Sequence, residues 1–331
     1  MERILLANSA FEGDNNAYLF TDGSETVLVD TGDWMNATRT QLEAGLADHS
    51  VSMADVDRVF LTHWHPDHTG LAGRIQKESG AIVHVHEADA PLVETNEHAW
   101  EEMKAKQQAL FEVWGMPDED RAALTEEMSN ALELDYAKPT VEPFVDGDTF
   151  SVNGNELRVV HTSGHADGLC IFEMELDGRH GVFSGDALLP KYTPNVGGAD
   201  VRVERPLEKY LRALRHIADA SYDRAWPGHR DPIDDPTARA EEIIHHHEER
   251  AWRVLDVLRR DGPSNPWAVS AALFGNLHGI HILHGPGEVY AHLEHLEREG
   301  FVEADGGKYQ LTDDARSALD TSSEDRWPLN A

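Results

Sequence analysis

The chain has 331 residues, with 61 Asp and Glu against 28 Lys and Arg, so its formal net charge is −33. Such a chain repels polyanions at low salt, and no run approaches the roughly 20 apolar residues of a membrane span. We therefore expect a soluble, cytoplasmic protein without a secretory leader, long enough for two domains, and without a membrane partner.

The first third of the chain predicts strands, a helix and another strand. Apolar and alternating runs over residues 1–31 are typical of strands, whereas residues 34–48 have the leucine spacing of one helical turn. The next apolar run, Val59 to Leu61, favours a strand that ends just before His63.

Four side chains that can bind metal follow this run within six residues: His63, His65, Asp67 and His68. Imidazole and carboxylate groups both suit zinc-class metals, and a loop between a strand and a helix can aim them at neighbouring ions. The segment therefore predicts about half of the ligands of a dinuclear metal site.

Residues 88–137 have a helical pattern that breaks at Gly115 and Pro117. The pattern then changes to four strand-like runs. These runs cover residues 150–152, 156–161, 169–176 and 180–184. Because a lone thiol cannot form an internal disulfide, we expect Cys170, inside one of these runs, to be a small core residue.

Three further polar side chains each follow an apolar run that turns at a glycine: His165, Asp186 and His229. Each would lie at a strand end. Single residues of this kind are usually ordinary, but together with the His63 to His68 loop they form an ordered set that favours metal binding.

The loop after Asp186 carries Lys191 and Tyr192 in a chain that is poor in cations. Because the loop starts at a candidate metal ligand, these two residues are candidates for binding an anionic or polar group of the substrate. The alternative is that Lys191 is simply solvated.

The last quarter of the chain predicts a second domain after the turn-rich segment 231–236. We expect helices over residues 237–260, 267–274 and about 287–299, then a hairpin from residues 301–302 to 309–311. Three helices and a hairpin are a winged-helix order. The third helix is mainly acidic, so we favour a packing, dimerisation or pocket-closing module over a nucleic-acid reader.

This arrangement resembles the metallo-β-lactamase superfamily over roughly residues 1–230. The resemblance implies an α+β fold in which an αββα sandwich spans residues 1–235, with a helical insertion at about 88–137. Residues 236–331 would form a winged-helix-like domain, similar to the tail of lactamase-like hydrolases that include a mitochondrial endoribonuclease.

The resemblance also implies a role for each site residue. It makes His63, His65 and His165 ligands of one metal and Asp67, His68 and His229 ligands of the other, with Asp186 bridging the two ions. Asp30 would steady the ligand loop. The commonest antibiotic-destroying members place a cysteine at the bridging position, so Asp186 argues against a lactam antibiotic as the natural substrate.

Insertions at residues 88–137 often wall the substrate pocket in this superfamily, which makes Trp100, Phe111 and Trp114 candidates for lining it. The alternative is a helical hairpin that covers its own apolar face. The sequence leaves both interpretations open.

The expected activity is hydrolysis of a small molecule, similar to the glyoxalase II branch of the superfamily. Two divalent ions, zinc in the first place with manganese or iron as alternatives, would supply a bridging hydroxide. Asp67 and Asp186 would be the catalytic carboxylates. The expected substrate is a carboxylic thioester, ester or lactone, and the alternative is phosphodiester hydrolysis of single-stranded RNA. A homodimer is compatible with the sequence.

The even spread of acidic residues and the low lysine count resemble proteins of salt-in halophiles. Concentrated salt, with a Debye length of about 3 Å at about 1 M, screens the self-repulsion of the folded chain. We therefore expect the thermal midpoint to rise between dilute buffer and multimolar KCl. Melting followed by circular dichroism measures it, and an unchanged midpoint would contradict the halophilic interpretation.

Overall fold

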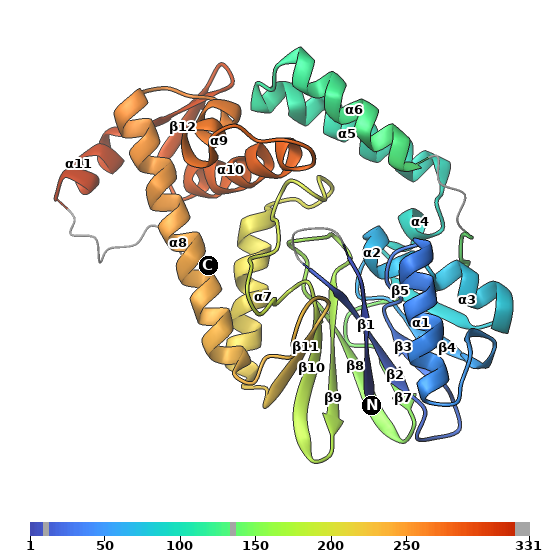
Figure 1. Ribbon diagram of the computed structural model, residues 1–331. Helices are drawn as coiled ribbons and strands as arrows, with labels where there is room; N and C mark the ends of the chain where they lie inside the picture. The colour runs from blue at the N-terminus through green and yellow to red at the C-terminus, as the bar shows by residue number, and fades with distance from the viewer. Residues whose placement is uncertain (9–12, 133–136, 322–331) are drawn as a thin grey trace. The chain divides into compact units, whose positions relative to one another are not determined.

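The computed structural model describes residues 1–8, 13–132 and 137–321 (Figure 1). These residues fall into two units. Unit 1 holds the described residues of 1–100, 135–194 and 213–240, and unit 2 holds those of 101–134, 195–212 and 241–321. All the candidate metal ligands belong to unit 1, so its two sheets are the elements that position the candidate site.

The first sheet of unit 1 has six strands in chain order. They are β1 (Glu2–Leu6), β2 (Asn15–Phe20), β3 (Val27–Val29), β4 (Arg58–Phe60), β5 (Ile82–His86) and β6 (Val141–Phe144). Strands β1 to β3 are antiparallel, whereas β3 to β6 are parallel, so the carboxyl ends of β3 to β6 meet at one edge. The strands expected before His63 are confirmed, while β5 and β6 were not predicted.

Short helices connect the strands of the first sheet. They are α1 (Asn36–Asp48), the 3₁₀ turn η1 (Met53–Asp55), α2 (Pro66–Thr69), α3 (Ala72–Ser79) and α4 (Ala90–Val93). Helix α1 confirms the helix predicted over residues 34–48, and its leucines at 42 and 46 are both fully buried. A helix with one apolar face packs on a sheet in this way because that face is removed from water.

The second sheet of unit 1 has five strands in the order β11-β10-β9-β8-β7. They are β7 (Thr149–Val152), β8 (Asn155–His161), β9 (Cys170–Leu176), β10 (Arg179–Gly185) and β11 (Arg224–Pro227). The first four confirm the four predicted strands. Neighbours in this sheet are antiparallel except β10 and β11, which are parallel and therefore end at the same edge.

The core of unit 1 lies between the two sheets. Tyr18 and Phe60 of the first sheet contact Phe183 and Phe172 of the second, with ring centroids 5.1 and 6.0 Å apart. Cys170 is fully buried in the same cluster, which confirms its expected place. Burying one such aromatic side chain contributes about 1.5–3 kcal/mol, so this double layer holds the strand ends in place.

Unit 2 is mainly helical. It contains α6 (Asp118–Leu132), α9 (Pro266–Phe274), α10 (His281–Arg298), β12 (Val302–Asp305), β13 (Lys308–Leu311) and α11 (Asp313–Thr321). Three further helices, α5 (Glu97–Trp114), α7 (Pro206–Ala220) and α8 (Pro236–Asp261), belong partly to unit 2 and partly to unit 1. The predicted order of three helices and a hairpin is present. Among the described helices, none is both long and apolar enough to cross a bilayer.

Residues 101–132 of the helical insertion belong to unit 2, whereas residues 88–100, which include Trp100, belong to unit 1. Within unit 2, Phe111 and Trp114 are almost completely buried, and the Trp114 ring lies 6.2 Å from that of Tyr290 on α10. This burial does not favour a pocket-lining role for Phe111 and Trp114. The described residues of 101–134 and 195–212 group with those of 241–321 in unit 2, and the division at residue 235 stays a prediction.

Helix α10 begins at His281, several residues earlier than the expected start near residue 287. Its first turns contain Gly285, Pro286 and Gly287, which are poor helix formers. The reason for the difference is packing, because a Cβ on Gly285 would lie 2.7 Å from Ser270 Oγ of α9. The close approach of α9 and α10 thus makes this segment helical, although its residues have a low helix propensity.

Replacing Phe183 with Ala should lower the free energy of unfolding by about 3–5 kcal/mol, because it leaves a cavity between the sheets. Chemical denaturation of metal-free protein would measure the loss. The exposed Val145 provides the matched control, and V145A should change stability by less than about 0.5 kcal/mol. Equal stability of F183A and V145A would contradict this view of the core.

Candidate metal centre

The ligand loop begins where β4 ends. His63 and His65 lie in this loop, and Pro66 starts the short helix α2, which carries Asp67 and His68. Proline suits a first helical position because its missing N–H needs no partner there. Gly70 closes the segment at a tight contact, since a Cβ there would lie 2.3 Å from the backbone nitrogen of Trp34.

The other three candidate ligands come from the second sheet. His165 lies in the loop between β8 and β9, Asp186 directly follows β10, and His229 lies two residues after β11. Because β10 and β11 are parallel neighbours, Asp186 and His229 lie close together. Gly228 allows this approach, since a Cβ at that position would lie 2.5 Å from Asp186 Oδ1.

His63, His65 and His165 converge on one point, and we call them group 1. Nδ1 of His65 lies 2.9 Å from Nε2 of His63 and 3.0 Å from Nε2 of His165. Three imidazole nitrogens at such distances are arranged as the ligands of one ion, which would lie between them.

Asp67, His68 and His229 form a second such set, which we call group 2. Oδ2 of Asp67 lies 3.4 Å from Nε2 of His229 and 3.8 Å from Nε2 of His68. Two imidazoles and a carboxylate are donors that zinc, manganese and iron all accept.

Asp186 lies between the two groups. Its Oδ1 is 3.5 Å from His68 Nε2, and its Oδ2 is 3.5 Å from His229 Nε2 and 3.6 Å from His165 Nε2. One carboxylate therefore faces nitrogens of both groups. The structure brings together all seven side chains that the sequence singled out.

In three of the site histidines, His63, His68 and His229, the ring nitrogen that points away from the site has a fixed partner. Asp30 Oδ2 accepts hydrogen bonds from His68 Nδ1 at 2.9 Å and from the Thr62 hydroxyl at 2.8 Å. That hydroxyl is in turn 3.0 Å from His63 Nδ1, while His229 Nδ1 donates to the Gly13 carbonyl at 2.9 Å. These bonds favour the tautomers in which Nε2 faces the site.

Burial of the site disfavours the charged forms of its histidines and carboxylates. Burial lowers the pKa of His229, but the charges of Asp186 and Asp67 outweigh it and raise the pKa to about 10. Burial raises the pKa of Asp186, but His229 and His68 hold it well below its usual value. His68 Nε2, His229 Nε2 and Asp186 Oδ1 are buried without a hydrogen-bond partner among the described residues. Divalent cations would satisfy these atoms, so the donor set fits them.

Sequence reasoning missed two asparagines that hold Asp67. Nδ2 of Asn8 and Nδ2 of Asn15 donate to Asp67 Oδ2 at 3.2 and 3.3 Å, and Asn15 is buried. Asparagine is common in turns and carries no spacing signal of its own. The isolated bridge between Asn15 and His229, which places the amide, could not be read from the sequence.

The two candidate substrate residues lie on a loop that two arginines contact. Lys191 Nζ lies 5.3 Å from the Tyr192 ring centroid, and the guanidinium of Arg230, the residue after His229, lies 4.9 Å from it. Arg239 donates to the carbonyls of Leu189 and Tyr192 at 2.7 and 3.0 Å. Arg239 thus anchors the loop. Lys191 of the loop and Arg230 beside it follow the site residues Asp186 and His229 closely in sequence.

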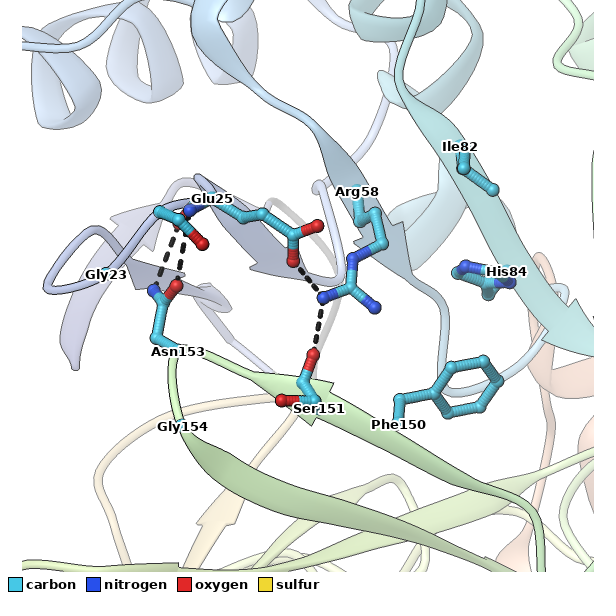
Figure 2. A pocket seen from close by; sticks show the side chains of 10 residues that line it. Gly23, Glu25, Arg58, Ile82, His84, Phe150, Ser151, Asn153 and Gly154 are labelled. Atoms are coloured by element: carbon cyan, nitrogen blue, oxygen red, sulfur yellow. Dashed lines mark hydrogen bonds and ion pairs between the residues drawn. The ribbon is translucent and has the colours of Figure 1, made fainter.

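Figure 2 shows residues that line a pocket at the amino ends of β4 and β5. The pocket volume is about 590 Å³, and the ligand loop lies at the other, carboxyl end of β4. Arg58 forms an ion pair with Glu25 there and donates to the Ser151 carbonyl at 2.5 Å. The charge of Arg58 is therefore matched within the protein, and this pocket is not part of the candidate metal centre.

A further set of side chains that could share an ion lies in unit 2: His247, Glu288 and His292. His247 Nδ1 lies 3.3 Å from His292 Nε2. Burial lowers the pKa of both histidines, and Arg250 balances the charge of Glu288 through an ion pair. We interpret this set as a polar part of the core of unit 2.

A family model and a solved structure both relate this chain to the same family. The family model described as the metallo-beta-lactamase superfamily matches residues 10–229. The crystal structure of a metallo-beta-lactamase family protein from Thermus thermophilus is similar, with 33% identity and a TM-score of 0.80, covering 94% of this chain and 98% of that chain.

Two curated relatives are similar over most of their length. The beta-lactamase-like protein 2 homolog of Drosophila melanogaster is 25% identical, covering 86% of this chain and 82% of the relative. The atrochrysone carboxyl ACP thioesterase of Aspergillus fumigatus is 28% identical, covering 79% of this chain and 69% of the relative. The chain spans only 59 to 60% of the length of several other fungal relatives.

Replacing Asp186 with Ala should weaken metal binding by at least on the order of 100-fold, because the carboxylate faces nitrogens of both groups. Metal analysis after gel filtration, together with competition against a chelator, would measure the loss. D48A, at an exposed position at the end of α1, serves as the control. A D186A variant with the metal content of the wild type would refute the bridging position.

Proposed function

The chain belongs to the metallo-beta-lactamase superfamily as a hydrolase, and we propose that it uses two divalent ions to cleave a carboxylic thioester, ester or lactone. The observation that carries the proposal is the position of Asp186. A single carboxylate within 3.6 Å of His165, His68 and His229 suits two neighbouring ions better than one.

In this proposal, group 1 holds one ion and group 2 holds the other, with Asp186 shared. The donors are histidine nitrogens and carboxylate oxygens, which favour zinc while also accepting manganese and iron. Bound divalent ions would lower the pKa of a water molecule and polarise the carbonyl oxygen of the substrate.

Asp67 has a second role in the proposal, as an acceptor that orients the attacking water. Burial raises the pKa of its carboxyl, but His68 and His229 hold that pKa well below its usual value. A carboxylate that resists protonation is a poor proton acceptor and a good hydrogen-bond acceptor. The amides of Asn8 and Asn15 fix Oδ2 of Asp67, so the side chain keeps one orientation.

The substrate class rests on two further observations. Two relatives of this chain are named as thioesterases, one of them as an atrochrysone carboxyl ACP thioesterase. Lys191 and Arg230 flank the Tyr192 ring on the loop that begins at Asp186, and cationic side chains there suit a substrate with an anionic group. Lys191 and Tyr192 are therefore the proposed substrate contacts.

We assign no nucleic-acid role to the C-terminal elements of unit 2. Helix α10, the third of the winged-helix order, carries Glu288, Glu294 and Glu297 against Arg298, whereas a phosphate-binding surface needs clustered Lys and Arg. This negative charge agrees better with a winged-helix-like module for packing or dimerisation than with one that binds RNA. For the same reason, RNA hydrolysis is our second choice of activity. The proposed location is the cytoplasm.

Parallel assays in multimolar KCl would test this function with an acyl thioester, an aryl phosphodiester and single-stranded RNA. We expect kcat/KM for the thioester to exceed that for the aryl phosphodiester by at least tenfold, which is about 1.4 kcal/mol of transition-state stabilisation, and RNA to remain intact. Activity should disappear on chelation and return with zinc. The reverse preference, or turnover that survives exhaustive chelation, would overturn the proposal.

A further inference from the structure

Asp89 is a buried carboxylate that the function described above does not use. It stands at the start of α4, where an aspartate usually accepts a hydrogen bond from an amide of its own helix, but it makes no such bond. Instead, Oδ2 accepts from the backbone N–H of Trp64 and Oδ1 from that of Gly168, both at 3.0 Å.

These two amides belong to the two loops that carry group 1. Trp64 stands between His63 and His65, and Gly168 is three residues after His165. The first loop leaves the first sheet and the second loop lies between strands of the second sheet. One carboxylate, three residues after the end of β5, therefore accepts hydrogen bonds from the backbone between His63 and His65 and from the backbone three residues after His165.

Gly168 gives independent support for a close fit at this point. A Cβ at position 168 would lie 2.5 Å from Asp89 Cγ and 2.8 Å from Oδ1, and atoms do not approach so closely. The glycine provides space rather than an unusual backbone conformation, because its φ lies outside the left-handed region. The approach of the carboxylate to this loop thus requires a residue without a side chain.

We propose that Asp89 is a positioning residue for the metal centre, fixing the distance between the His63 and His65 loop and the His165 loop. The inference rests on the proposed two-ion site. A buried carboxylate is costly to bury without partners, and two charge-assisted hydrogen bonds to backbone amides make its place well defined. Asp30 acts on the rings of His68 and, through Thr62, of His63, whereas Asp89 acts on the backbone of group 1.

The inference predicts an asymmetry between the groups. Replacing Asp89 should weaken the ion held by group 1 more than the ion held by group 2. The Trp64 amide stands between two group 1 ligands, whereas Asp67 and His68 lie on α2 and His229 follows β11. An Asn side chain keeps the shape of Asp89 but presents an NH₂ group to one of the two amides. D89N therefore removes one bond and opposes a donor with a donor.

Binding of Co²⁺ in two single-group backgrounds would test this asymmetry. H229A leaves group 1 complete, and H165A leaves group 2 complete. In H229A, D89N should weaken Co²⁺ binding by about 10–100-fold and alter the visible absorption of the bound ion. In H165A, D89N should change the affinity less than about threefold, well below that range.

Two further variants separate positioning from a general loss of stability. G168A pushes on the carboxylate from the opposite side and should reproduce the selective loss in H229A. E87Q changes an exposed carboxylate two residues before Asp89 and should have no effect in either background. Thermal melts of the metal-free proteins would confirm that each variant is folded, and G168A provides the test if D89N is not.

The outcomes distinguish this inference from the function on which it rests. Equal weakening in both backgrounds, or no weakening by D89N and G168A, would overturn the positioning role while the two-ion site stands. A wild-type protein that binds no Co²⁺ would overturn the two-ion site, and the positioning role with it.

Discussion

The structure depends on the close packing of carboxylates and imidazoles at one edge of a double β-sheet. Asp67 and Asp186 are held as anions by neighbouring histidines, although burial opposes the charged state of both partners. Such an arrangement is stable only if each group is hydrogen-bonded or bound to a cation. The outward-facing ring nitrogens of His63, His68 and His229 have protein partners, and the inward-facing nitrogens and oxygens are the candidate ligand atoms.

The two sheets make this concentration of charge feasible. Their facing aromatic layers supply apolar burial, and the parallel pairs β3 to β6 and β10 to β11 bring several strand ends to the same edge. Loops at that edge need only a few residues to reach the centre. Glycines at positions 70, 168 and 228 mark the points where backbone and side chains approach too closely for a Cβ. The packing of the two sheets therefore positions the side chains of the candidate site.

The net negative charge of the chain is a property of the whole surface and not of the candidate site. A formal charge of −33 acts over the whole surface, is screened by salt, and does not choose the fold. At the candidate substrate loop the local charge differs, because Lys191, Arg230 and Arg239 gather around Tyr192.

The sequence by itself singled out the seven candidate ligands, because four of them stand within six residues and the others follow strands that periodicity reveals. It also determined most of the strands, and the helices of the tail. Tertiary structure alone decided that Asp186 faces both groups, that His65 presents Nδ1 where His63 presents Nε2, and that residues 101–132 of the helical insertion group with unit 2. It also revealed Asn15 and Asp89, whose partners lie 25 to 79 residues away in the chain. The physical reason is that ligand chemistry and periodicity are local, whereas these contacts arise from packing between segments distant in sequence.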